Sequence, residues 1–290
     1  MIKHDKALLP ALSAVLLWST VATAFKIALR HTDYMNLLFY SSLTSAAALF
    51  IILIANGKIG MLKAMPRRAV IKSMLLGVLN PFLYYLVLFR AYSLLRAQEA
   101  LVLNYTWAVM VVIFSAVILK RKVKALGYAA ILISFAGVFV IATKGSLDFR
   151  IDEPAGMGLA LGSSVIWALF WIFNIDKGTD EVLRLFLSFL SGFILIAGVL
   201  LATGRMALPG AEGILASVYI GLFEMGITFV LWTKALNTTD NISRTGNLVY
   251  LSPFLSLAFI AFILGESLLL SSFAGLALIL AGIIIQQTAK

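Results

Sequence analysis

Glu224 is the acidic residue whose position in the chain most strongly suggests chemistry. It stands between Gly221 and Gly226, at the centre of a long apolar run. If that run crosses a membrane, a carboxylate at its centre is energetically costly and predicts a functional site. There it could attract the ammonium group of a substrate or exchange a proton. The alternative is a protonated or hydrogen-bonded Glu224 that joins two helices.

Asn80 and Pro81 form a second polar interruption, at the centre of another apolar run. Pro81 has no N–H to donate to the carbonyl of Gly77, and a freed carbonyl beside an amide could line a polar cavity. The alternative is an ordinary proline kink, which is common in membrane helices. Pro253 in the same way frees the carbonyl of Val249, and there the sequence favours a kink.

Aromatic side chains are candidates for contact with a flat substrate ring. Trp167 and Trp171 are four residues apart and so share a helix face, and Tyr84 lies four residues after Asn80. Such residues also suit ordinary helix packing or anchoring at the membrane surface. The full set of candidate substrate-binding residues is Glu224, Asn80, Tyr84, Trp167, Trp171, Tyr105, Trp107 and Tyr250, with Pro81 and Pro253 as candidate hinges.

Two further patterns have a structural interpretation. Gln98, Glu99 and Asn104 start one apolar run, and we interpret them as the usual polar residues of a helix end rather than as a polar vestibule. Gly158 and Gly162 form a GxxxG pattern, which predicts close packing between helices inside the protein.

The composition requires that the elements carrying these residues lie in a membrane. Of the 290 residues, 62% are hydrophobic and 12% are charged, against about 45–50% and about 25% in soluble domains. This excludes a soluble enzyme, a nucleic-acid-binding protein and a disordered chain. The net charge of +10 then indicates basic cytoplasmic loops. With no Cys and only two His, the sequence predicts neither a metal site nor a cofactor.

Ten apolar runs approach the length of about 20 residues that a membrane-spanning helix needs. They extend over Ala7–Leu29, Met35–Ala55, Val70–Tyr92, Ala97–Leu119, Ala125–Thr143, Gly156–Ile175, Leu183–Thr203, Gly213–Leu236, Thr245–Leu264 and Leu268–Gln287. The predicted fold is therefore an all-α integral membrane protein. Most Lys and Arg fall on one side when the N-terminus is cytoplasmic, which predicts that both termini are cytoplasmic.

The two halves of the sequence show a weak internal similarity. An offset of 145 residues aligns 103–137 with 248–282 and pairs Tyr105 with Tyr250, and an offset of 144 pairs Asn80 with Glu224. We therefore predict two five-helix repeats, 1–145 and 146–290. Because five is odd, the second repeat is inverted, an arrangement typical of transporters that bind substrate at the membrane midplane and work by alternating access.

These features make the chain resemble the drug/metabolite transporter superfamily, in its EamA family. The residues that carry the resemblance are Trp18, Trp167, Leu264, Gly265, Glu266, Gly275, Ala281 and Gly282. The first half departs from the pattern, since Lys120 and Arg121 stand where Gly265 and Glu266 would align. Within the superfamily the chain is most similar to YddG-type aromatic amino acid exporters. The resemblance implies an exporter of amino acids, especially aromatic ones, in a bacterial inner membrane.

Two other functions stay open. An exporter of another metabolite or of a lipophilic cation would pair the cation with Glu224. A membrane-embedded enzyme or a channel is disfavoured, because no intramembrane His, Cys or paired carboxylate is present in the sequence. The chain has no Walker A pattern, so transport is expected to be passive or driven by a gradient, with a small molecule and the lipid bilayer as its partners and no obligate protein partner.

Overall fold

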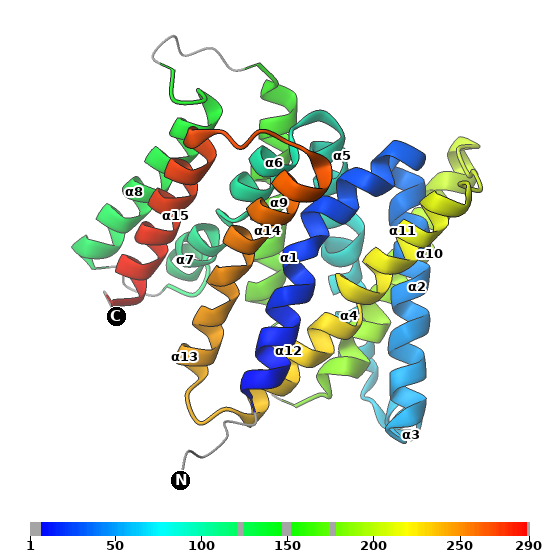
Figure 1. Cartoon of the computed structure of the whole chain (residues 1–290). Helices are drawn as coiled ribbons and strands as arrows, with labels where there is room; N and C mark the ends of the chain where they lie inside the picture. The colour runs from blue at the N-terminus through cyan, green and yellow to red at the C-terminus, as the bar shows by residue number, and fades with distance from the viewer. Residues whose placement is uncertain (1–6, 121–123, 147–151, 175–177, 289–290) are drawn as a thin grey trace. The chain divides into compact units, whose positions relative to one another are not determined.

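The computed structural model describes residues 7–120, 124–146, 152–174 and 178–288, and within them it contains helices and no strand (Figure 1). The helices are α1 (Leu8–His31), α2 (Tyr34–Ala55), α3 (Ile59–Ala64), α4 (Arg67–Gly77), η1 (Val78–Leu83), α5 (Tyr84–Leu94), α6 (Ala97–Asn104), α7 (Trp107–Val117), α8 (Ala125–Ala142), α9 (Pro154–Phe173), α10 (Glu181–Thr203), α11 (Ala211–Phe223), α12 (Ile227–Thr238), α13 (Ile242–Asn247), η2 (Leu248–Leu251), α14 (Ser252–Leu264) and α15 (Leu270–Thr288). The two termini, which the sequence predicts to be cytoplasmic, lie outside the described residues, as do Arg121 and Ile175.

The prediction of a ten-helix membrane protein is confirmed. In the described part of the chain, nine helices are long and apolar enough to cross a membrane, and the shorter apolar helix Leu270–Ile285 is the tenth. Several helices begin before or end after the predicted apolar run, because the ends of a helix are set by its capping residues and not by hydrophobicity. Thus α4 begins at Arg67, directly after Pro66, and α10 begins directly after its N-cap, Asp180.

Contacts divide the chain into two compact units, which we describe separately. Unit 1 comprises Met1–Phe82 and Asp176–Leu264, and unit 2 comprises Leu83–Ile175 and Gly265–Lys290. Each unit therefore contains helices from both halves of the sequence. The predicted repeats 1–145 and 146–290 describe sequence similarity and remain a prediction.

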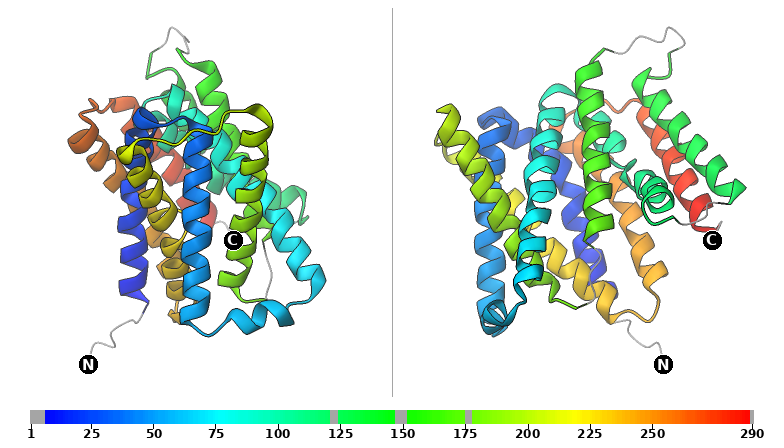
Figure 2. Two further views of the ribbon diagram at one scale, coloured as in Figure 1. Left: turned by 90° about the vertical axis from the view of Figure 1, so that its right-hand side faces the viewer. Right: turned by 180° about the vertical axis from the view of Figure 1, so that it is seen from behind.

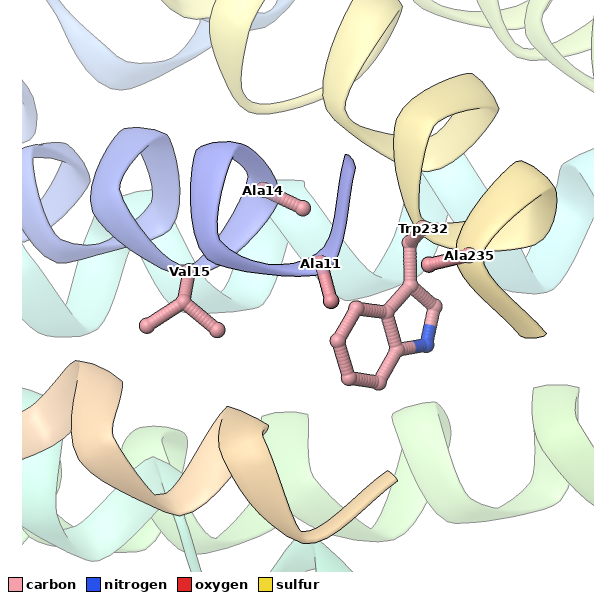
Figure 3. Packing of buried hydrophobic residues seen from close by; sticks show 5 residues of the cluster. All are labelled: Ala11, Ala14, Val15, Trp232 and Ala235. Carbon is pink, nitrogen blue, oxygen red and sulfur yellow. The ribbon is translucent and has the colours of Figure 1, made fainter. Parts of the chain in front are cut away.

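In unit 1, α2 packs against α10 and α11, while α1 packs against α11, α12 and α14 (Figures 1 and 2). Small residues permit these close contacts, as is usual between membrane helices. A Cβ atom on Gly221 of α11 would lie 2.5 Å from the carbonyl oxygen of Ser41 in α2. Near the start of α1, Trp232 and Ala235 of α12 pack with Ala11 and other small side chains of α1 (Figure 3).

Three polar contacts in unit 1 join loops that the predicted topology places on the same side of the membrane. Lys58, after α2, forms an ion pair of 2.5 Å with Asp180, at the start of α10. The amide of Asn36 donates to the carbonyl of Arg205 and accepts from the N–H of Ala207, each over 3.0 Å. His31 and Glu212 form the third pair, with 2.9 Å between Nδ1 and Oε2.

The ion pair of Lys58 with Asp180 predicts an acid-dependent stability. Burial raises the pKa of Asp180, but the hydrogen bond from Lys58, the N–H of Leu183 and the ammonium charge together hold it below its ordinary value. The stabilisation is therefore present above the unfolded pKa of about 3.9 and is lost as the pH falls through the folded pKa. Because Asn also caps helices, Asp180→Asn is expected to remove only the ion pair, about 1 kcal/mol or less.

Thermal unfolding in detergent between pH 3 and pH 7 measures this effect. Lys58→Met should give the same loss of stability as Asp180→Asn, and the double variant should lose no more than either single variant. A wild-type acid dependence that persists in Asp180→Asn would contradict the assignment.

In unit 2, α9 packs against α5, α6 and α7, and α15 packs along α8 (Figures 1 and 2). Gly137 of α8 and Gly275 of α15 lie against each other, and a Cβ atom on Gly137 would be 2.6 Å from the carbonyl oxygen of Gly275. The predicted close packing at the GxxxG pattern is wrong for Gly158, because a Cβ atom added there would meet no neighbouring atom within 4 Å. Gly156 makes the close contact on α9 instead, against Leu95.

Candidate functional site

The apolar run that contains Asn80 is interrupted where the sequence predicts it. Between α4 and α5 the helix widens into η1, and at Asn80 the backbone leaves the helical region, with φ −141° and ψ 116°. Pro81, which cannot donate a backbone hydrogen bond, packs against Gly192 of α10, where a side chain would overlap the proline ring. The interruption is therefore held in place by α10 within unit 1.

The Asn80 side chain is fully buried, and its amide nitrogen and oxygen have no hydrogen-bond partner among the described residues. A buried amide group without a partner costs about 1–3 kcal/mol per group, and such groups in native proteins are usually explained by a ligand, an ion or water. Asn80 therefore offers two N–H donors and one carbonyl acceptor at a helix interruption.

Glu224 lies at a second break, between α11 and α12. It is the C-cap of α11 and is partly buried, and α12 begins only at Ile227. The N–H groups of Glu224 and Met225 both donate to the carbonyl of Ile220, which marks the end of regular α-helix. The predicted centre of a continuous helix is thus a helix end, where a carboxylate sits beside irregular backbone.

Three oxygen atoms lie close to Gly226, two residues after Glu224. A Cβ atom on Gly226 would lie 3.0 Å from the carbonyl oxygen of Gly221, 3.3 Å from that of Leu222 and 3.7 Å from Oγ of Ser45 in α2. The Ser45 hydroxyl is buried and has no hydrogen-bond partner in the described part of the chain. A side chain at position 226 would press on the two carbonyl oxygens, so glycine is favoured at this point of the break.

Unit 2 contains an aromatic cluster, which we define as the buried residues Tyr84 of α5 and Trp167 and Phe170 of α9, with the partly buried Trp171 of α9. The rings of Tyr84 and Trp167 stack at 4.5 Å between centroids with an interplanar angle of 29°. Trp171 meets Trp167 edge-on at 6.0 Å, and its indole N–H is buried with no hydrogen-bond partner among the described residues. The cluster therefore combines packed aromatic rings with one hydrogen-bond donor, the indole N–H of Trp171, that is free to bind an acceptor.

A polar network joins this cluster to a third break, at Tyr105 and Thr106 between α6 and α7. Asn104 accepts a hydrogen bond of 3.2 Å from the Tyr84 hydroxyl and donates one of 2.9 Å to Ser163. Thr106 donates one of 2.9 Å to Ser164. The network positions Tyr84 against α9 and supplies partners to polar groups that lipid could not satisfy.

The remaining candidates lie at helix junctions. Trp107 is the first residue of α7, and Tyr105 lies in the break before it; both are partly buried. Tyr250 lies in η2 and Pro253 is the second residue of α14, so the 3₁₀ segment η2 changes to α-helix at this proline. The structure thus brings Tyr84, Trp167 and Trp171 together in unit 2, while Asn80, Pro81, Glu224, Tyr250 and Pro253 belong to unit 1.

The helix interruptions at Asn80, Tyr105, Glu224 and Tyr250 are related by the same residue offsets as the two halves of the sequence. Asn80 pairs with Glu224 at an offset of 144 residues, and Tyr105 pairs with Tyr250 at 145. Interrupted helices at corresponding positions of two halves are typical of transporter binding sites.

Sequence reasoning missed several residues that the structure places in these networks. Gln98 and Glu99 are not solvent-facing residues of a helix end, since they are 0% and 5% exposed. Asn104, which the sequence grouped with the start of the helix, is the last residue of α6 and a member of the network, and Ser163 and Ser164 are members that no motif marked. Helical spacing could have indicated Ser163, because it precedes Trp167 by four residues and so lies on the same face of α9.

Comparisons with known proteins agree with this architecture. The EamA-like transporter family matches residues 5–143 and again residues 154–286. An uncharacterized transporter of Clostridium kluyveri is 28% identical over 74% of this chain and 71% of its own length. The aromatic amino acid exporter YddG of Ancylobacter novellus is 24% identical over 87% of each chain. A solved crystal structure, 23% identical, aligns with a TM-score of 0.66 over 96% of this chain and 95% of its own, which shows the fold alone.

Proposed function

Because the chain belongs to the EamA-like transporter family, we propose that it exports amino acids, especially aromatic ones, across a bacterial inner membrane. The family assignment made from the sequence is confirmed, and the protein is a multi-pass membrane transporter. The substrate class and the direction of transport are the proposal.

The observation that carries the proposal is the aromatic cluster of unit 2. Tyr84 and Trp167 already stack on each other, and a substrate ring would gain the same stacking and edge contacts. The unpartnered indole N–H of Trp171 would donate to a polar atom of the substrate. The relative from Ancylobacter novellus, named as an aromatic amino acid exporter, supports the same class.

Two roles are proposed in unit 1. At its break, Glu224 would attract the ammonium group of an amino acid or exchange a proton, because a partly buried carboxylate within a membrane-spanning segment is energetically costly and needs a reason. The buried amide of Asn80 would donate to a carboxylate or accept from an ammonium group. Each role is separately testable.

The mechanism we propose is alternating access by two inverted repeats, 1–145 and 146–290, with both termini in the cytoplasm. Two family matches, one in each half, and the paired helix interruptions support it. Transport would be passive or driven by a gradient, since the sequence carries no Walker A pattern.

Efflux from liposomes tests the substrate class. The purified protein is reconstituted, the vesicles are loaded with labelled tryptophan, alanine or a lipophilic cationic dye, and efflux is measured with and without a pH gradient. Tryptophan efflux well above that of empty liposomes supports the proposal. Dye efflux without amino acid efflux would replace it with export of lipophilic cations.

Glu224→Gln tests the break in unit 1. The variant keeps the side-chain volume but cannot become an anion, so tryptophan efflux is expected to fall about tenfold, the effect of losing one charge-assisted contact. Any dependence of efflux on the pH gradient should also disappear. The matched control is Glu153→Gln, at an exposed position before α9. Unchanged efflux with an unchanged pH response would remove Glu224 from the mechanism.

A further inference from the structure

The motif that closes the ninth predicted span, Gly265 and Glu266, has no part in the function proposed above. In unit 2 the segment 265–269 lies against the start of α6, and two side chains make the contacts: Glu266 and Gln98. We call these two residues the clasp. The predicted topology places both loops on the same side of the membrane, as this contact requires.

Glu266 binds the N-terminus of α6. Its Oε1 accepts from the backbone N–H of Ala97 over 3.0 Å, and its Oε2 lies 3.4 Å from Nε2 of Gln98. A carboxylate is favoured there, because the first N–H groups of a helix lack internal partners and carry partial positive charge. Glu99 adds a second acceptor, for the N–H of Arg96 at 3.2 Å.

Gln98 uses both ends of its amide and is fully buried. Its Nε2 donates to the carbonyl of Ser267 over 2.9 Å as well as to Glu266. Its Oε1 accepts from the N–H of Leu269 over 2.8 Å and from the hydroxyl of Ser272 over 2.9 Å. Only an amide offers donors and acceptors together in this arrangement, so Glu, Leu or Met could not replace Gln98 without leaving partners unsatisfied.

The clasp connects to the aromatic cluster through one short helix. It holds α6 at Ala97 and Gln98, and α6 ends at Asn104, which binds both Tyr84 and Ser163. Because α6 has only eight residues, about two turns, Gln98 and Asn104 lie within two turns of each other on one helix. In the first half of the sequence, Lys120 and Arg121 stand at the aligned positions and cannot accept these hydrogen bonds.

We propose that Gln98 and Glu266 are positioning residues that set α6, and through Asn104 the Tyr84 ring, in the geometry that binds an aromatic substrate. This inference rests on the proposed function of the aromatic cluster. The clasp does not itself touch the substrate.

A swap of the two side-chain types tests the proposal. Gln98→Glu loses both donor contacts and places two carboxylates side by side, so the KM for tryptophan is expected to rise about tenfold. Adding Glu266→Gln returns an amide donor opposite the new carboxylate and should recover part of the loss in KM, since the carbonyl of Ser267 still lacks its donor. Glu153→Gln, at an exposed position before α9, is the matched control for the substitution at Glu266 and should transport as wild type.

Hydrogen exchange separates the clasp from the proposed function. Amides of α6 should exchange faster in Gln98→Glu and return toward wild type in the double variant, whatever the substrate is. If wild-type protein moves no aromatic amino acid, the proposed function fails while the exchange data still test the clasp. Unchanged exchange in Gln98→Glu overturns the clasp. Faster exchange with an unchanged KM overturns its positioning role, and a double variant no better than Gln98→Glu overturns the pairing with Glu266.

Discussion

Replacing Trp167 with alanine is expected to reduce tryptophan efflux more than any other change in the candidate site. The ring stacks on Tyr84 at 4.5 Å, packs with Phe170 at 5.5 Å and meets Trp171 at 6.0 Å, so its loss removes the centre of the aromatic cluster. Aromatic pairs contribute about 0.5–1.5 kcal/mol each beyond their buried area. If the substrate ring makes two such contacts with Trp167, their loss is about 1–3 kcal/mol, and efflux at limiting substrate should fall about fivefold to 150-fold.

A smaller change keeps this prediction testable if Trp167→Ala folds poorly. Trp167→Phe keeps a flat ring, and we expect a threefold to tenfold rise in the KM for tryptophan, roughly 1 kcal/mol, with alanine efflux unaffected. Phe262→Ala is the control, because its ring is 89% exposed on unit 1 and has no role in the cluster. Wild-type kinetics for tryptophan in Trp167→Phe and folded Trp167→Ala would exclude the cluster from substrate binding.

Gly221→Ala is expected to give one of the largest losses of stability among single-methyl additions in unit 1, together with Gly77→Ala and Gly192→Ala. The new Cβ would lie 2.5 Å from the carbonyl oxygen of Ser41 and 2.6 Å from Cβ of Thr44, so α11 must move away from α2. Overpacking of this kind costs about 1–3 kcal/mol, and more where backbone is the obstacle. The same displacement reaches Ser217, whose carbonyl accepts a 3.1 Å hydrogen bond from Ser41.

Melting temperature in detergent and the yield of folded protein measure the effect. The matched control is Gly158→Ala, since nothing lies within 4 Å of its Cβ position and the substitution favours the helical backbone of α9. Gly158→Ala should melt at or slightly above the wild-type temperature. Equal melting temperatures for the two variants would show that α2 and α11 do not pack as closely as described.

The membrane spans could be predicted almost residue by residue, since the length of an apolar run is a local property of the chain. Predicted and observed ends differ by about three residues at most, as at Val70 and Arg67. The interruption at Pro81 was equally predictable, because a missing N–H is part of the residue itself.

The other interruptions follow from packing. Nothing local to Tyr105 and Thr106 forbids a helix, and the break there accompanies hydrogen bonds to Ser163 and Ser164 of α9. At Glu224 the sequence showed glycines on both sides, but the end of α11 depends on the close approach of α2 at Gly221 and Gly226. Such contacts join residues far apart in the sequence and leave no periodic signal.

Glu224 shows most clearly the difference between what the sequence predicts and what the tertiary structure decides. From its type and its apolar surroundings it was already a candidate for chemistry, since a charge in hydrocarbon needs a reason. Its placement at the end of α11 is visible only in the structure, where Gly221 of the same helix packs closely against α2. Gln98 was the opposite case: its sequence position suggested an ordinary helix end, and its four partners lie in or next to the segment 265–272. The length of an apolar segment is a property of consecutive residues and can be predicted from the sequence. The hydrogen-bond partners of buried polar groups depend on which distant helices pack together, and only the tertiary structure shows them.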